Sequence, residues 1–392
     1  MYSPYPRHAH NRFKLLVDGD RFIPAMLTAI SSARFYILLE MYLCASGQLM
    51  DRFIDALCRA RKRKVHVCVL LDDFGSLNLS LHDRHRLLAA GVKLRFFNPI
   101  RIGPLQRNLC RDHRKLLIAD GQTGFIGGAG LTDDFDPWSE PQDWWHDLML
   151  EIHGDCLVDL QKEFARLWNH SGADKSTLPK FQKPDVYEFG TGGAQVLVQH
   201  RHRGQILATL IHRIRQAQQR VLISVAYFVP PRVLSFALRH AAKKGVEVRL
   251  ILPGPKTDHD FARYAGRRHY GRLLRAGVRI HEYQPRFTHV KLYVCDDWVS
   301  LGSANLDHWT LRWNEEANLG IEDVNTLESC LETFRTDLAE SKEITLDQWQ
   351  SRSRWVRLQE WFWGLLSDWL ARHNYRRGLR NPRRNPPRDW RD

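Results

Sequence analysis

The 392-residue sequence has few cysteines, no Cys-x-x-Cys pair and no long apolar run. Its seven cysteines are scattered, at positions 44, 58, 68, 110, 156, 295 and 330. This usage argues against a structural zinc site or a disulfide framework and favours a reducing compartment. No segment approaches the ~18 uninterrupted apolar residues of a membrane-spanning helix, and residues 1–13 lack the apolar core of a secretory signal. We therefore expect a soluble or peripheral protein.

Acidic residues are the minority charge: 44 Asp and Glu stand against 58 Lys and Arg, a formal net charge of +14. Such an excess predicts an anionic partner, either nucleic acid or a negatively charged membrane surface. With 43% apolar and 26% charged residues the composition is that of a globular protein. The length suffices for two domains.

The chain contains an internal repeat. Three apolar, β-rich segments recur in the same order, namely 34–43 with 220–230, 64–73 with 246–254, and 87–99 with 273–285. Helical patterns separate them, so we expect an α/β fold of two duplicated α-β-α domains with mixed or parallel sheets, related by a pseudo-twofold axis. The boundaries we expect are an N-terminal domain (1–170), a Gly/Pro/Ser-rich linker (171–193), a C-terminal domain (194–345) and a tail (346–392).

One motif, His-x-Lys-x-x-x-x-Asp, stands at equivalent places in the two halves. It is His113, Lys115 and Asp120 in the first half, and His289, Lys291 and Asp296 in the second. On a strand, residues two apart share a face, so each histidine and lysine should point the same way. The aspartates follow at an odd spacing of seven, which predicts that they face away or lie at a turn and hold the backbone.

Two histidines and two lysines around one anion suit phosphodiester transfer. One imidazole attacks phosphorus and forms a phosphohistidine, the other donates and accepts the proton, and the lysines neutralise the phosphate oxygens. A single His-x-Lys is more often a surface or core feature. Its recurrence at equivalent positions of a repeat favours one catalytic site built from two half-sites.

Further polar residues extend each motif. Asp147 follows His113 and Glu316 follows His289, so we expect each carboxylate to orient the imidazole of its own half, as in a catalytic triad. Ser303 and Asn305 follow the second motif as polar donors beside glycines that admit a ligand.

The doubled motif with its trailing Gly-Ser-x-Asn resembles the phospholipase D superfamily over residues 12–340. Within it, the segments "ILLEMYL", "AYFVP", "GSANLD" and "NEEAN" are most similar to bacterial cardiolipin synthases, in particular the shorter B type. The resemblance implies transfer of a phosphatidyl group between two phosphatidylglycerol molecules with release of glycerol, without metal, nucleotide or other cofactor. It also implies that His113 is the nucleophile and His289 the acid/base, although the residues alone leave that choice open.

The sequence departs from the family pattern in two places. Gly130 stands where the family usually has asparagine, and the second motif's hairpin is one residue shorter than the first. Glu40 either lines the site, as the family likeness suggests, or is a buried structural carboxylate. We expect Glu40 to stand at the strand end equivalent to that of Tyr227 in the second half. We expect activity to survive, and a non-catalytic membrane-binding relative is the alternative that these changes raise.

The tail favours a membrane over nucleic acid. Residues 355–370 place Trp355, Phe362, Trp369 and several leucines on one helical stripe, and residues 351–392 hold eleven arginines against four acids. This composition is typical of an interfacial anchor on anionic lipid, at the cytoplasmic side of a bacterial inner membrane. The stripe packing on the protein itself, and a phosphodiesterase acting on nucleic acid or hydrolysing phospholipid, are the alternatives. Three arginines of loop 99–111, Arg101, Arg107 and Arg111, are candidates to meet a second lipid phosphate.

Overall fold

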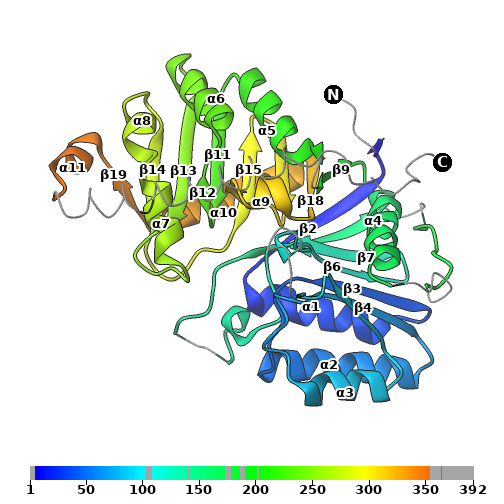
Figure 1. Ribbon diagram of the computed structural model, residues 1–392. Helices are drawn as coiled ribbons and strands as arrows, with labels where there is room; N and C mark the ends of the chain where they lie inside the picture. Colours follow the sequence, from blue (N-terminus) through cyan, green and yellow to red (C-terminus); the bar gives the residue numbers. More distant parts are fainter. Residues whose placement is uncertain are drawn as a thin grey trace, which may run out of the picture.

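The computed structural model describes residues 5–101, 108–139, 142–172, 178–185, 190–200, 203–353 and 363, and its two large sheets lie one in each half of the chain (Figure 1). The first sheet has seven strands in the order β2-β8-β7-β6-β3-β4-β5. Their bounds are β2 Asn11–Val17, β3 Tyr36–Met41, β4 His66–Asp72, β5 Lys93–Phe97, β6 Lys115–Ala119, β7 Thr123–Gly127 and β8 Leu148–Gly154.

The second sheet repeats this order as β9-β18-β16-β15-β11-β13-β14, which confirms the duplication. The shared strands are β9 Gly193–His200, β11 Arg220–Val225, β13 Glu247–Pro253, β14 Arg279–Tyr283, β15 Lys291–Cys295, β16 Trp298–Gly302 and β18 Glu316–Glu322. Its additional strands are β1 Arg7–His8, β10 Arg203–Gly204 and β19 Ser341–Ile344. A separate short pair joins β12 Phe228–Val229 to β17 Leu306–Asp307.

Both sheets are mixed, as expected. Strands β3, β4 and β5 pair in parallel, as do their equivalents β11, β13 and β14. In the part of the chain that the structure describes, the other neighbouring strands of this shared set pair antiparallel. The parallel strands are joined by amphipathic helices, which bury their apolar stripe on one sheet face. The larger helices are α1 Gly19–Ser32, α2 Gln48–Lys62, α3 Leu81–Ala89, α4 Cys156–His170, α5 Gln205–Gln216, α6 Arg232–Lys243 and α10 Val324–Ala339; shorter ones are α7 Asp260–Arg267, α8 Tyr270–Leu274, α9 Thr310–Trp313 and α11 Leu346–Ser351.

The two repeats share one core. Outer clusters pack α1 and α2 on the first sheet and α5 and α6 on the second, whereas the inner cluster joins residues of both sheets with α4 and α10. Helix α4 packs against β9 of the other half, and its counterpart α10 packs against β2. Because β2 and β9 are equivalent strands, this reciprocal packing is the mark of a pseudo-twofold relation.

The N-terminal segment crosses to the second half. Strand β1 of the N-terminal segment pairs with β9 in the second sheet. Helix α4 ends at His170 and β9 begins at Gly193, and the residues described between them include Phe181, whose ring lies 5.9 Å from that of Tyr36. Of the predicted tail, α11 packs on α8 through Trp349, and Trp363 is described as well; its other residues beyond 353 lie outside the described part. Within that part, no helix combines the length and apolarity needed to cross a bilayer.

Candidate active site

Both His-x-Lys pairs lie where the two halves meet. Lys115 is the first residue of β6 and Lys291 the first of β15, and each strand has neighbours on both sides. Both lysines are 1% exposed, and His113 and His289, two residues earlier, are 8% and 5% exposed. The four groups are withdrawn from water, so charge on any of them must be offset by nearby groups.

Each histidine is held through its backbone by the opposite half. The His113 N–H donates to the Glu315 carbonyl at 3.0 Å, and the His289 N–H donates to the His146 carbonyl at 2.7 Å. Both contacts belong to isolated parallel β-bridges at equivalent places in the repeat. The residue after each acceptor is an acid, and the bridge fixes where that acid lies.

The carboxylates that face the histidines come from the opposite half. His113 Nδ1 lies 3.0 Å from Glu316, and His289 Nδ1 lies 2.7 Å from Asp147. Our expectation that each histidine uses the acid of its own half is therefore wrong. The reason is topological: within each half the acid stands at the start of β8 or β18, two strands away from the histidine strand, a gap of about 9–10 Å. The pseudo-twofold relation brings the other half's acid into contact instead.

Burial controls the protonation of the cluster. It lowers the pKa of Lys115 to about 7 and that of Lys291 to about 8. It also lowers the pKa of His113, and together with the charge of Lys291 it lowers the pKa of His289 well below its usual value. Burial raises the pKa of Asp147 to about 6, against the opposing charge of Lys291. A phosphodiester anion among these groups would stabilise their protonated forms, so the cluster gains from binding an anion.

The two carboxylates have different partners. Glu316 accepts hydrogen bonds from the Ser303 hydroxyl at 2.5 Å and from the Asn314 amide at 3.2 Å. The position equivalent to Ser303, one residue after the hairpin strand, is Gly128, where a Cβ atom would overlap the Asp147 carboxylate. The first-half glycine thus makes room for Asp147, while the second-half serine restrains Glu316.

Aromatic rings surround one histidine much more than the other. The ring of His113 has Tyr42 at 4.7 Å. Four rings lie around His289, with centroid distances of 5.4 Å (Trp145), 5.5 Å (Phe135), 5.8 Å (Phe287) and 6.4 Å (Tyr227). Our sequence reasoning missed this cage. The sequence feature that could have predicted the cage is the aromatic residues just before Asp147, in "WWHD", and just before His289, in "RFTH".

The motif aspartates lie at the far end of their strands, about 17 Å of strand away from the lysines. Both occupy turns with positive φ, 55° at Asp120 and 50° at Asp296. Each accepts three backbone N–H groups at 2.7–2.9 Å, from residues 34–36 and 218–220 respectively. These bonds anchor the starts of β3 and β11. The structure therefore gives the aspartates the structural role that their odd spacing predicts and keeps them out of the His-Lys cluster.

Glu40 is a buried carboxylate behind the site. It is fully buried and lies 2.6 Å from the Arg114 guanidinium. Strand pairing places it on the face opposite to Lys115 and makes Ser224, not Tyr227, its equivalent in the second half. Of our two alternatives for Glu40 the structure supports the structural one, and the equivalence with Tyr227 is wrong.

Gly130 has a packing reason. A Cβ atom there would lie 2.7 Å from the Leu43 carbonyl oxygen. At the equivalent place in the second half, Asn305 is buried and its side-chain oxygen accepts the Tyr227 N–H at 3.4 Å. The first half thus has no room for the asparagine that the second half uses beside its motif.

The arginines of loop 99–111 differ in their surroundings. Arg111 is buried, lies 3.4 Å from Asp72 and donates to the Asn98 carbonyl at 3.0 Å. It is committed to the protein, so our suggestion that it meets a second phosphate is wrong. Arg101 is exposed, and Arg107 lies outside the described residues.

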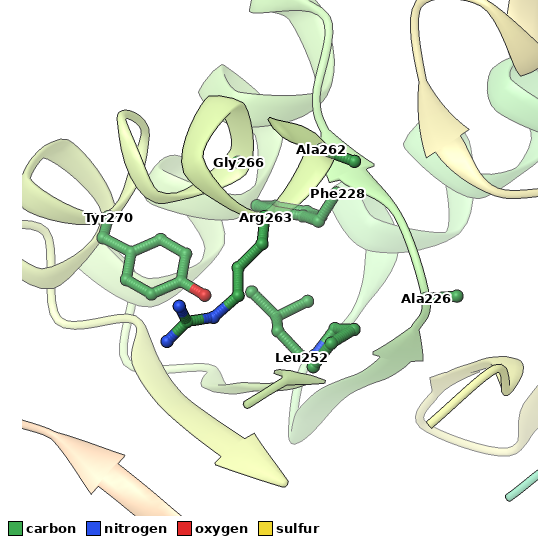
Figure 2. A pocket seen from close by; sticks show the side chains of 8 residues that line it. Ala226, Phe228, Leu252, Ala262, Arg263, Gly266 and Tyr270 are labelled. Atoms are coloured by element: carbon green, nitrogen blue, oxygen red, sulfur yellow. The ribbon is translucent and has the colours of Figure 1, made fainter. Parts of the chain in front are cut away.

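A small cavity lies beside the site in the second half, under α7 and α8 (Figure 2). Figure 2 shows the Arg263 side chain extending past Leu252 toward Tyr270. The cavity measures about 10 Å³, room for roughly one water molecule. The cavity borders Ala226. The equivalent residue in the first half is Tyr42, whose ring lies against His113. A lipid headgroup does not fit in the cavity.

Two copies of one α/β fold that share a buried His-Lys cluster define a phospholipase D-like protein. A family model described as "Cardiolipin synthase, PLD-like domain" matches residues 26–168 and 210–338. The chain belongs to this cardiolipin synthase family.

Named relatives agree with that assignment. The chain is 32% identical to the major cardiolipin synthase of Bacillus subtilis (strain 168), over 92% of this chain and 76% of that one. It is 30% identical to the cardiolipin synthase of Geobacillus thermodenitrificans (strain NG80-2), over 93% and 74% of the two chains. The crystal structure of phosphatidylserine synthase from Haemophilus influenzae Rd KW20 superposes with a TM-score of 0.71 at 15% identity, covering 96% of this chain and 97% of that one. That likeness establishes the shared fold.

Proposed function

We propose that the protein is a cardiolipin synthase, a phosphatidyltransferase that moves the phosphatidyl group of one phosphatidylglycerol onto the terminal hydroxyl of a second and releases glycerol. The observation that carries the proposal is the reciprocal cluster, in which each histidine contacts an acid of the other half directly and a buried lysine lies beside each histidine. Family membership and the named relatives support the same activity.

In the first step, His113 attacks phosphorus through Nε2. Its Nδ1 faces Glu316, which Ser303 restrains, so the Nδ1–H tautomer is favoured and the Nε2 lone pair is free. A P–N bond forms, the P–O bond to glycerol breaks, and protonated His289 gives its proton to the glycerol oxygen. Lys115 and Lys291 neutralise the phosphate oxygens during the step.

In the second step, His289 takes the proton from the acceptor hydroxyl, whose oxygen attacks phosphorus and releases His113. The aromatic cage suits His289 to this role. Four rings on its side of the cluster keep water away from the base, so the hydroxyl that loses its proton is one delivered by the second lipid. Transfer is thereby favoured over hydrolysis to phosphatidic acid.

Exposed apolar side chains support work at a membrane surface. Five loop residues and one residue of α7 (Phe261) that follow the site edge of the sheets are large and apolar, with exposed fractions of 38–56%: Phe74, Leu77, Ile100, Trp138, Phe261 and Trp309. Since a lipid keeps its acyl chains in the bilayer while its phosphate reaches the histidines, these residues are suited to contact the bilayer. None of the seven cysteines, all described, forms a disulfide, which suits the cytoplasmic side of a bacterial inner membrane.

The test uses purified protein and phosphatidylglycerol vesicles in the presence of a metal chelator. We expect equal amounts of cardiolipin and glycerol, and loss of both products in His113→Ala and His289→Ala. Isotope-labelled donor should leave label on His113, located by mass spectrometry. Phosphatidic acid as the sole product would make the protein a phospholipid hydrolase, and cleavage of DNA or RNA instead would make it a nucleic-acid phosphodiesterase.

A further inference from the structure

A groove of about 220 Å³ lies between α10 and the second sheet, away from the histidines. It is lined by Arg220 and Glu247, the first residues of β11 and β13, whereas the site lies beyond the other end of β11 at Val225. The groove and the His-Lys cluster are therefore at opposite ends of the same strand, and a ligand in one does not enter the other.

The groove is basic. Arg220 of β11, Arg249 of β13 and Arg335 of α10 line it against one acid, Glu247, which forms an ion pair with Arg249. In the described part of the chain, no ion pair is found for Arg220 or Arg335. Two arginine charges are thus available to an anion.

The groove also has an apolar part. Leu331, Phe334 and Leu338 recur at the spacing of one face of α10, and Leu222 of β11 lines the groove with them. A ligand that fills the groove must therefore combine an anionic group with an apolar chain.

The first half has no such groove at the equivalent position of its described residues. Strand pairing makes Tyr36 and Cys68 the equivalents of Arg220 and Arg249. Tyr36 and Cys68 are 1% and 0% exposed, and the ring of Phe181 packs on Tyr36. A closed and buried place in the first half, where the Tyr36 hydroxyl contacts Gln161 and Gln182, thus corresponds to an open arginine-lined groove in the second half.

An unused hydrogen-bond donor lies among the groove residues. Arg249 Nε is buried and has no hydrogen-bond partner. Buried polar groups are rarely left in this state without a ligand or water to satisfy them.

We propose that this groove binds an anionic phospholipid, with its phosphate held by Arg220, Arg249 and Arg335 and one acyl chain lying along Leu331, Phe334 and Leu338 of α10. The protein then carries two phospholipid sites: the His-Lys cluster, where lipid reacts, and the groove, where it is held without reacting. Because the groove lies at the end of β11 opposite to the His-Lys cluster, a lipid bound there is held apart from the lipid that reacts.

The test counts bound lipids when turnover is blocked. His113→Ala protein is mixed with dihexanoyl phosphatidylglycerol below its micelle concentration, and stoichiometry and affinity are measured by native mass spectrometry and calorimetry. We expect two bound lipids per chain. Adding Arg220→Ala and Arg335→Ala should weaken one of them at least tenfold and leave the other unchanged. The control adds Arg215→Ala and Arg272→Ala, two exposed arginines on α5 and α8, and should retain both sites.

Three results would overturn the proposal. These are a single bound lipid in the parent variant, equal binding of dihexanoyl phosphatidylcholine at the groove, or displacement of the lipid by inorganic phosphate at equal concentration. Melting temperatures of all variants establish that they are folded. A protein with two lipid sites that makes no cardiolipin would refute the proposed function and leave the groove assignment intact.

Discussion

Each histidine faces an acid of the opposite half, and one substitution tests this arrangement against the alternative in which each histidine uses the acid of its own half. In Glu316→Gln, the shape of the buried side chain is kept while its charge is removed. Burial lowers the pKa of His113, and the charge of Glu316, 3.0 Å away, opposes that shift. Removal of the Glu316 charge should therefore lower the pKa of His113 further, although the two residues lie in different halves of the chain.

The size of the shift follows from the geometry. A carboxylate in contact with a buried cation is worth roughly 1–3 pKa units, or about 1.4–4 kcal/mol. The amide also loses the preference for the Nδ1–H tautomer, which in a triad costs up to about 10⁴ in turnover. We expect formation of the phosphohistidine to slow by roughly 10²–10⁴ and the pKa of His113 to fall below its value in the parent protein.

Histidine-selective ¹⁵N NMR measures the titration, with the His113 signal assigned from its loss in His113→Gln. Rapid-quench labelling with phosphatidylglycerol measures phosphohistidine formation. The matched control is Asp147→Asn, which faces His289 and should leave the His113 titration unchanged, because Asp147 is not among the charges that act most strongly on the pKa of His113. A His113 shift in Asp147→Asn and none in Glu316→Gln would refute the reciprocal arrangement.

Three further outcomes are expected. Ser303→Ala removes a hydrogen bond to a buried carboxylate and should lower turnover roughly 10–100-fold, measured on vesicles, with no loss of folded protein. Because the pKa of Lys115 is about 7 and that of Lys291 about 8, binding of a non-cleavable phosphonate analogue should weaken as pH rises through 7–8, where the lysines lose their charge; calorimetric affinity that rises over this range would contradict it. Gly130→Asn restores the usual family residue but collides with the Leu43 carbonyl, so urea denaturation should show a loss of about 1–3 kcal/mol and the assay no gain in turnover.

Much of the fold could be predicted because the same pattern of segments occurs twice, so each half supports the interpretation of the other. Segments that recur in the same order predicted two α/β units, and the strand order of the two sheets is the same. The odd spacing of the motif aspartates predicted turns that hold the backbone, and Asp120 and Asp296 each accept three N–H groups there. These inferences concern single strands, where sequence spacing determines direction.

Contacts across the pseudo-twofold interface could not be predicted in the same way. The sequence places Asp147 and Glu316 after their motifs at similar distances, and nothing in that spacing says which histidine each one meets. The pairing depends on strand order and on how the two sheets face each other. The same holds for the cage around His289, whose rings come from both halves, with Phe135 and Trp145 in the first and Tyr227 and Phe287 in the second.

A duplicated site with reciprocal acids cannot work as two separate halves, because each histidine lacks its carboxylate without the other repeat. Symmetry alone would also give two equivalent histidines, yet a two-step transfer needs one nucleophile and one acid/base. The differences between the halves supply this distinction. Ser303 restrains the acid of His113, Gly128 leaves the acid of His289 without that hydroxyl, and four aromatic rings lie around His289 against one beside His113. In the mechanism that we propose, twofold packing builds the phosphate site and these local departures from symmetry divide the chemistry between the two imidazoles.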